Sequence, residues 1–176
     1  MTMSHEIPAT PLRFVFALLA IALLTSTSGC VQPSMQASSH SSALPASASD
    51  PRAATAFVLP ADLAATLKGS GEKPLLLHVG FAVLYRGGAI PGSRYAGPGS
   101  TPEGLASLQA AVKDVPHDHA IVIYCGCCPW DHCPNMRPAF QTLRDMGFTR
   151  VRALYTPKNL ETDWVNHGYP IEKGSS

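Results

Sequence analysis

The chain has 176 residues, which allows one domain of ordinary size with some length outside it. Its formal net charge is +1 at pH 7, and charged residues make up 14% of the sequence, fewer than in an average cytosolic domain. The basic residues are scattered along the chain, so nothing in the sequence indicates nucleic-acid binding.

Residues 1–29 have the pattern of a secretory signal peptide. Arg13 precedes an apolar run, Phe14–Leu24, that is too short to span a bilayer. Small residues follow, and the end of this segment, Ser28-Gly29-Cys30, resembles a bacterial lipobox, in which the cysteine is lipidated. We therefore expect Cys30 to carry a lipid anchor to a membrane. Ordinary cleavage nearby, which would give a soluble periplasmic protein, is the alternative.

Residues 30–55 are expected to form a disordered tether behind the lipidated cysteine. This stretch is mostly Ser, Ala and Pro, with almost no large apolar side chains, so it cannot bury a core. The folded domain is then expected over residues 56–176. With the anchor in place, the protein would be lipid-anchored in the cell envelope and its domain would face the periplasm.

Strands and helices alternate through this domain. Its apolar run Ala120–Tyr124 is continuous and rich in β-branched residues, as in strands buried on both faces of a parallel sheet. Alternating elements predict an α/β fold in which helices cover both faces of a parallel sheet. In chain order the pattern predicts a helix over 60–67, a strand over 75–80, a turn and short extended piece over 87–95, a helix over 101–115, a strand over 120–124, a helix ending near 146, a strand over 151–155 and an amphipathic piece over 159–166.

Four of the five cysteines follow the strand 120–124, and open α/β folds place their sites on such strand-to-helix loops. Cys125 comes directly after the strand. There the N–H groups of the loop and the dipole of the next helix would lower its pKa. We expect Cys125 to be a thiolate near neutral pH and a nucleophile. The alternative is a small buried hydrophobic residue at a strand end.

Three roles are open for the remaining cysteines of the loop, Cys127, Cys128 and Cys133. We expect a disulfide between Cys128 and Cys133, which would close a small ring. The cysteines would otherwise serve as resolving thiols for Cys125, or bind zinc or copper(I) together with His132. Because ordinary structural zinc sites use two separated pairs of ligands and this chain has one cluster, no resident metal is expected. No cofactor is expected either.

Other residues near the loop are candidates for binding or catalysis. Arg137 lies in the first turn of the next helix and is the best candidate for binding an anion. His78, at the end of a neighbouring strand, would suit a general base or thiolate partner, although a hydrogen-bonded strand-end histidine is the alternative. Gly126, Trp130 and His132 are assigned to substrate binding, with Trp130 packing over the site.

Several short motifs occur in an order that resembles the rhodanese-like domain. They are the turn Gly88-Ala89-Ile90-Pro91-Gly92-Ser93, the strand end Tyr124-Cys125, the segment Gly147-Phe148-Thr149-Arg150-Val151-Arg152-Ala153-Leu154 and the terminus Trp164-Val165-Asn166-His167-Gly168-Tyr169-Pro170. The resemblance covers roughly residues 57–173. It implies a small α/β domain with about five parallel strands, in which Cys125 holds the place of the persulfide-forming cysteine.

The chain departs from the family pattern beside the candidate site. His78-Val79-Gly80 stands where the family usually has Asp-Val-Arg, Thr156–Asn159 replaces a Gly-Gly pair, and the loop after Cys125 is longer. The resemblance implies a periplasm-facing sulfurtransferase or persulfide carrier that takes a small sulfur donor, such as thiosulfate or a polysulfide. A thiol-redox or soft-metal protein that uses the whole cluster is one alternative, and a rhodanese-like binding module without turnover is another. The sequence identifies no protein partner.

Overall fold

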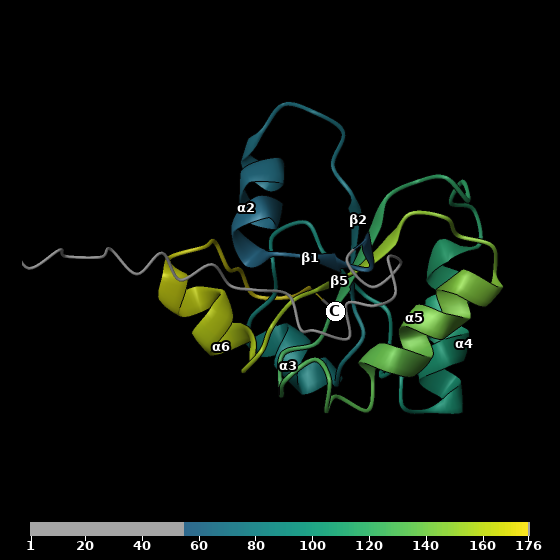
Figure 1. Cartoon of the computed structure of the whole chain (residues 1–176). Coiled ribbons are helices and arrows are strands. Elements are labelled where there is room, and N and C mark those ends of the chain that lie inside the picture. The colour runs from purple at the N-terminus through teal and green to yellow at the C-terminus, as the bar shows by residue number, and fades with distance from the viewer. Residues whose placement is uncertain (1–54, 176) are drawn as a thin grey trace, which may run out of the picture. The chain divides into compact units, whose positions relative to one another are not determined.

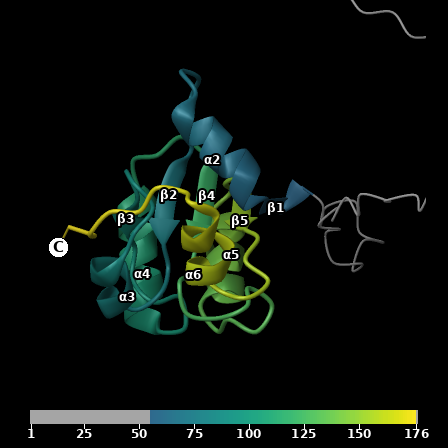
Figure 2. The same ribbon diagram turned by 90° about the vertical axis from the view of Figure 1, so that its left-hand side faces the viewer.

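Five parallel strands form the centre of the fold. The computed structural model describes residues 55–175. Along the sheet the strands follow the order β1-β5-β4-β2-β3, every pairing is parallel, and Figure 2 shows them side by side. Their bounds are β1 Phe57–Val58, β2 Leu75–His78, β3 Arg94–Tyr95, β4 Ile121–Tyr124 and β5 Val151–Leu154. The predicted five-stranded parallel sheet is confirmed.

Helices cover both faces of this sheet, as predicted. Helices α4 and α5 lie on one side, and α2 and α6 lie on the other (Figure 1). The helices are α2 Pro60–Lys68, α3 Ala82–Gly87, α4 Pro102–Val112, α5 Met136–Asp145 and α6 Leu160–Asp163, which is followed by the short 3-10 helix η1, Val165–His167.

Strand β4 is buried on both faces, because its side chains alternate between two hydrophobic clusters. Ile121 and Ile123 pack into the cluster that includes the apolar faces of α4 and α5. Val122 and Tyr124 belong to the cluster under α2 and α6. All four side chains are completely buried. The continuous apolar run in the sequence is therefore explained by a central strand with no solvent-facing side.

The ends of two predicted helices are set by chemistry that is local in the sequence. Thr101 caps α4, and its hydroxyl oxygen accepts a hydrogen bond from the Gly104 N–H at 3.0 Å. Gly147 follows the last turn of α5 with φ at +90°, a conformation that costs glycine little. These two positions fix where the chain enters and leaves the helices that cover one face.

The sequence analysis missed helix α3. It has six residues, its N-cap is Phe81, which makes no side-chain capping bond, and its first turn has no acidic residue. A helix this short, without a polar cap, leaves no clear signature in the sequence. Strand β1 was also missed as a strand, because it is only two residues long.

Tyr124 connects the central strand to the turn at residues 88–93. Its hydroxyl oxygen accepts a hydrogen bond from the Ile90 N–H at 3.1 Å and lies 2.7 Å from Ser93 Oγ. Burial raises the pKa of Tyr124 to about 12, so its hydroxyl stays protonated. Tyr124, which directly precedes Cys125, therefore joins the end of the central strand to the distant turn at residues 88–93.

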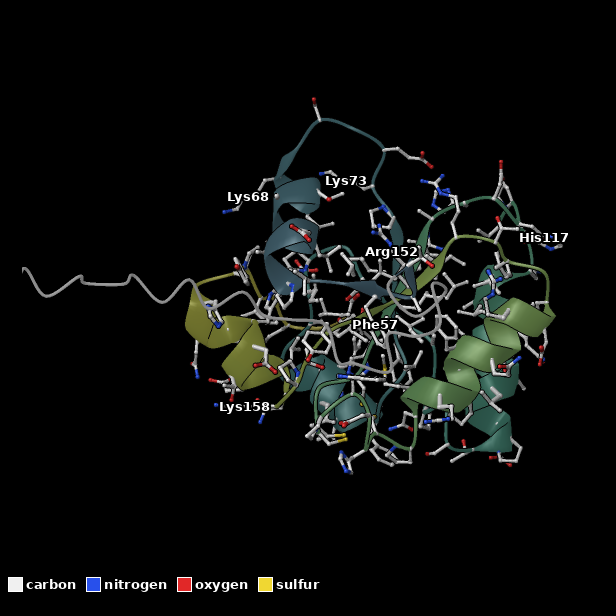
Figure 3. The ribbon with its side chains drawn as sticks, in the orientation of Figure 1. Phe57, Lys68, Lys73, His117, Arg152 and Lys158 are labelled. Atoms are coloured by element: carbon white, nitrogen blue, oxygen red, sulfur yellow. The ribbon has the colours of Figure 1, made fainter. Side chains whose placement is uncertain are left out.

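The predicted signal peptide, Cys30 and the tether up to residue 54 lie outside the described residues. Among residues 55–175, no helix is long and apolar enough to cross a membrane. The basic residues labelled in Figure 3 lie on separate parts of the fold, with Lys68 at the end of α2, Arg152 on β5 and Lys158 just before α6.

We predict that Tyr124→Phe lowers the free energy of unfolding by about 1–3 kcal/mol, because it leaves the buried Ile90 N–H without its acceptor. Urea unfolding measures the change. Tyr169→Phe is the matched control: Tyr169 is half-buried, and the described structure records ring contacts for it and no hydroxyl hydrogen bond. Equal stabilities of the two variants would contradict this role of the Tyr124 hydroxyl.

Candidate active site

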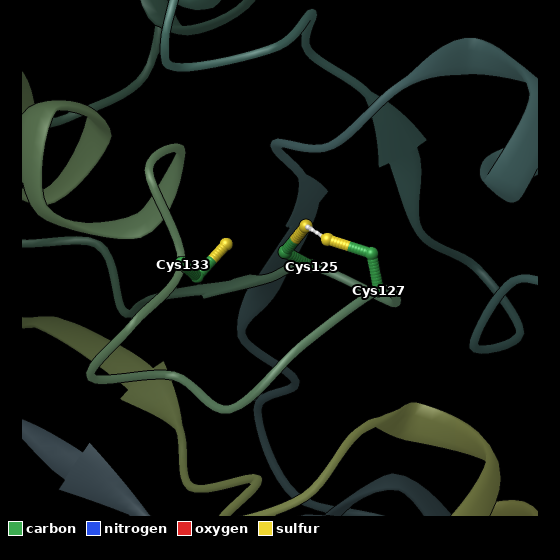
Figure 4. A group of neighbouring side chains, drawn as sticks. All are labelled: Cys125, Cys127 and Cys133. Atoms are coloured by element: carbon green, nitrogen blue, oxygen red, sulfur yellow. Dashed lines mark hydrogen bonds between the residues drawn. The ribbon is translucent and has the colours of Figure 1, made fainter.

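The four loop cysteines surround the carboxyl end of β4. Cys125 follows the strand directly, Cys127 and Cys128 lie on the loop, and Cys133 lies just before α5. In Figure 4 the sulfur atom of Cys133 points toward those of Cys125 and Cys127. Cys125 and Cys133 are buried, at 3% and 5% exposure, while Cys127 is exposed. The cluster therefore has a buried part and one thiol at the surface.

The sulfur atoms in this cluster are close together. The Sγ atoms of Cys125 and Cys127 are 3.5 Å apart, and those of Cys127 and Cys128 are 3.0 Å apart. The Sγ atoms of Cys125, Cys127 and Cys133 all lie within 4.8 Å of one another. All four cysteines are free, so the disulfide expected between Cys128 and Cys133 is not formed in this structure. That pairing stays a prediction for the oxidised protein.

Trp130 anchors the tip of the cysteine loop. Its backbone N–H donates a hydrogen bond to the Thr156 carbonyl at 3.1 Å, and its ring packs edge-on against Phe57 with ring centres 4.4 Å apart. Its ring also contacts Tyr155. These contacts hold the loop against β1 and the segment after β5. The role of Trp130 in substrate binding stays a prediction.

Asn135 holds the other end of the loop and reaches the candidate nucleophile. Its side chain is fully buried, and its Oδ1 accepts a hydrogen bond from the Ser100 N–H at 3.0 Å. Its Nδ2 donates to Cys125 Sγ at 3.7 Å. The sequence analysis did not select Asn135. The available signal was a polar residue between the last loop cysteine and an amphipathic helix.

In this structure the surroundings favour negative charge on Cys133 over Cys125. The pKa of Cys133 is lowered, chiefly by its interaction with the nearby Cys125 thiol, and also because the N–H groups of Asn135 and Met136 point at its sulfur. The interaction with Cys133, together with burial, raises the pKa of Cys125. The expectation that Cys125 is the thiolate near neutral pH stays a prediction, and the start of α5 favours charge on Cys133, the sulfur that is next to it.

His78 is a buried hydrogen-bond donor at the end of β2. Burial lowers its pKa to about 4, so the ring is neutral at neutral pH. Its Nδ1 accepts a hydrogen bond from the Gly80 N–H at 3.3 Å, which places the ring proton on Nε2. That Nε2–H has no partner in the described structure. The predicted role of His78 as a general base stays a prediction; in this arrangement its free N–H is a donor that a bound anion would satisfy.

Gly80 separates His78 from Cys125 and was missed by the sequence analysis. A Cβ at this position would lie 2.7 Å from Cys125 Sγ and 2.9 Å from His78 Cε1. Gly126 also borders this space, because a Cβ there would lie 4.0 Å from His78 Nε2. The structure therefore brings together three of the predicted site residues, His78, Cys125 and Gly126, around a position that only glycine fits.

Arg137 and His132 lie at exposed positions around this centre. Arg137 lies in the first turn of α5, where it lines a cavity of about 150 Å³ together with Trp130 and Met136. His132 Nδ1 lies 2.8 Å from Asp131 Oδ1, and this hydrogen bond lowers the pKa of the Asp131 carboxyl. The predicted roles of Arg137 in anion binding and of His132 in substrate binding stay predictions.

A separate cavity lies away from the cysteines. It has a volume of about 740 Å³, and its lining includes Ala120 and Val151 together with the side chains of Arg144 and Arg150. Ala120 and Val151 lie at the amino ends of β4 and β5, whereas Cys125 follows the carboxyl end of β4. Sites in open parallel sheets form at the carboxyl ends, so we assign the chemistry to the cysteine cluster.

We predict that Gly80→Ala lowers the free energy of unfolding by about 1–3 kcal/mol, because the new methyl group would overlap the Cys125 sulfur and the His78 ring. Urea unfolding measures the loss. Gly71→Ala provides the control, since a Cβ at that position meets no atom within 4 Å. If the two variants unfold at the same denaturant concentration, the close approach at Gly80 is not a real constraint.

Comparisons of the sequence find no relative: no protein-family profile and no curated protein matches it. Solved structures do match. The BH2092 protein from Bacillus halodurans is similar over 69% of this chain and 80% of its own, with a TM-score of 0.54 and 22% identity. The rhodanese-like domain of the Alr3790 protein from Anabaena sp. is similar over 68% of this chain and 80% of its own, with a TM-score of 0.50 and 20% identity.

A third similar structure is a thiosulfate sulfurtransferase from Pseudomonas aeruginosa. The similarity covers 72% of this chain and 22% of that one, with a TM-score of 0.52 and 20% identity. These identities are low, so the likeness concerns the arrangement of strands and helices. The observed sheet order, the helices on both faces and these structural neighbours lead to one conclusion: the described part of this chain has the fold of a rhodanese-like domain, the fold of sulfurtransferases.

Proposed function

We propose that this chain is a sulfurtransferase or persulfide carrier that accepts a sulfur atom on Cys125. The observation that carries the proposal is the unpartnered Nε2–H of His78, which is buried beside Cys125 at the carboxyl edge of the sheet. Buried donors almost always have partners, so this one indicates a site for an anionic ligand. A persulfide on Cys125, or the donor that delivers its sulfur, would supply the negative charge.

The proposed reaction uses the closeness of the Cys125 and Cys133 sulfur atoms, which lie within 4.8 Å of each other. As Cys125 Sγ attacks the outer sulfur of thiosulfate, the thiol proton passes to the Cys133 thiolate. A bond forms between Cys125 Sγ and the outer sulfur, the S–S bond of thiosulfate breaks, and sulfite leaves with the electron pair. The products are a Cys125 persulfide anion, a Cys133 thiol and sulfite, so charge and atoms balance.

Two donors would stabilise the persulfide anion in this pocket. The Nε2–H of His78 has no other acceptor, and Asn135 Nδ2 already donates to the Cys125 sulfur. Hydrogen bonds to a charged sulfur in a buried pocket are stronger than those to a neutral one. Cys127 is exposed and lies 3.5 Å from Cys125, so it is the thiol nearest to the route by which a donor or acceptor would arrive.

The neighbouring structures support the class of donor. One of them is a thiosulfate sulfurtransferase, although this chain spans only 22% of that protein. Thiosulfate fits the proposed site because it is a small anion and carries a transferable sulfur. A polysulfide shares both properties.

We predict that the reduced chain gains one sulfur atom when it is incubated with thiosulfate or a polysulfide, and that the atom maps to Cys125. Intact mass measurement followed by peptide mapping detects it. Cys125→Ser should lose the adduct. Cys128→Ser should keep it, because this variant changes a nearby loop thiol and leaves Cys125, Cys133 and His78 in place.

Two results would overturn this proposal. Mapping of the sulfur to Cys127, Cys128 or Cys133 would move the nucleophile to another residue. Absence of an adduct on the folded protein with either donor would replace sulfur transfer by a binding module without turnover.

We further propose that Cys30 is lipidated and holds the domain in the cell envelope, facing the periplasm. The support is in the sequence, where an apolar run too short to span a bilayer is followed by small residues ending in Ser28-Gly29-Cys30 and then by a Ser-rich and Ala-rich stretch. A chain of this composition would hold the domain away from the membrane surface.

We predict that cells grown with a labelled fatty acid incorporate the label into the wild-type chain and not into Cys30→Ser. The measurement is the label recovered with the purified protein, normalised to its amount. Equal labelling of both chains, or of neither, would contradict lipidation at this cysteine.

A further inference from the structure

We propose that Cys125, Cys127 and Cys133 form a binding site for a single copper(I) ion. This inference concerns the same cluster as sulfur transfer but does not depend on it, because it requires three sulfur ligands and no sulfur donor. It rests on the distances between the sulfur atoms, on the chemical type of the ligands and on the groups that surround them.

The three sulfur atoms already have nearly the arrangement that a three-coordinate ion needs. They lie within 4.8 Å of one another, and those of Cys125 and Cys127 are 3.5 Å apart. A metal–thiolate bond is about 2.3 Å long. Three such bonds in one plane therefore place the sulfurs roughly 4 Å apart. Rotation of the Cys127 side chain, which is exposed, would bring the sulfurs to this spacing.

The ligand type selects a soft ion. Among residues 55–175, the group that could hold a metal here consists of cysteines and contains no carboxylate. Thiolates favour copper(I) and zinc over calcium, magnesium or manganese, which prefer oxygen. The donor set alone therefore leaves copper(I) and zinc as the candidates.

The number of ligands favours copper(I) over zinc. Structural zinc is almost always bound by four ligands in a tetrahedron. Cys128 is next to Cys127 in the chain, and its sulfur lies 3.0 Å from that of Cys127 and also interacts with that of Cys133. It is not in the group in which every sulfur lies within 4.8 Å of the others. His132 is exposed and is hydrogen-bonded to Asp131. The described cluster therefore presents three ligands, which suit copper(I) in a trigonal site.

Surrounding donors would stabilise the negative charge of the bound thiolates. Asn135 Nδ2 donates to Cys125, and the N–H groups of Asn135 and Met136 at the start of α5 point at the Cys133 sulfur. The start of a helix also favours negative charge through its dipole. Access is provided by Cys127, which is exposed, while the other two ligands are buried. A copper(I) ion would be captured at the surface and bound in the interior.

The test is a competition for copper(I) with the coloured chelator bicinchoninate, carried out on the reduced full-length chain without oxygen. Cys30→Ser serves as the background, so that the loop supplies all the thiols. We expect the protein to withdraw one copper ion per chain from the chelator. Cys127→Ser should lower the affinity at least roughly tenfold, since even outer partners of metal ligands are worth that much. Cys128→Ser is the matched control and should bind as the background chain does.

Three outcomes would overturn the proposal. The first is failure of the folded background chain to compete for copper(I). The second is an equal loss in Cys127→Ser and Cys128→Ser, which would mean that the sulfurs do not act as the three ligands proposed. The third is binding of zinc to all four thiols with an affinity that copper(I) does not exceed. Sulfur mapping to Cys125 tests the other proposal separately, because it is measured without copper.

Discussion

The fixed position of the carboxyl end of β4 is the constraint on which the candidate site depends. Ile123 and Tyr124 are fully buried on opposite faces of the sheet, so the strand cannot shift or rotate without opening a core. Cys125 follows at once, and its sulfur lies between Gly80 on one side and the Asn135 amide on the other. A long loop can therefore carry chemistry here, because its first sulfur is positioned by the sheet and its last by a helix.

The fold was predictable where one strong pattern decides the structure. The run from Ile121 to Tyr124 could only be a strand in the middle of a covered sheet, and Thr101 and Gly147 marked helix ends through chemistry that is local in the sequence. Helix α3 could not be predicted, because it has neither a cap nor a long apolar stripe. Its formation depends on packing against the rest of the domain, which local sequence does not report.

The members of the site were predictable in part, and their protonation was not. His78 ends β2 and Cys125 follows the adjacent strand β4, so parallel order alone places them at one edge. Gly80 and Asn135 belong to the site because each contacts Cys125 from a different segment of the chain. No sequence motif indicates these contacts. The sequence favours charge on Cys125 and the structure favours charge on Cys133, because the sequence does not show how the two sulfurs lie relative to the next helix.

The unpartnered N–H of His78 has a consequence for the stability of the whole domain. A buried donor without an acceptor costs roughly 1–3 kcal/mol, and His78 Nε2–H has no acceptor among the described protein groups. An anion that accepts this hydrogen bond removes the cost, and it binds the folded state only, so it must stabilise the fold as well. Under the proposed function, ligand occupancy and resistance to unfolding would therefore be thermodynamically linked through one nitrogen atom.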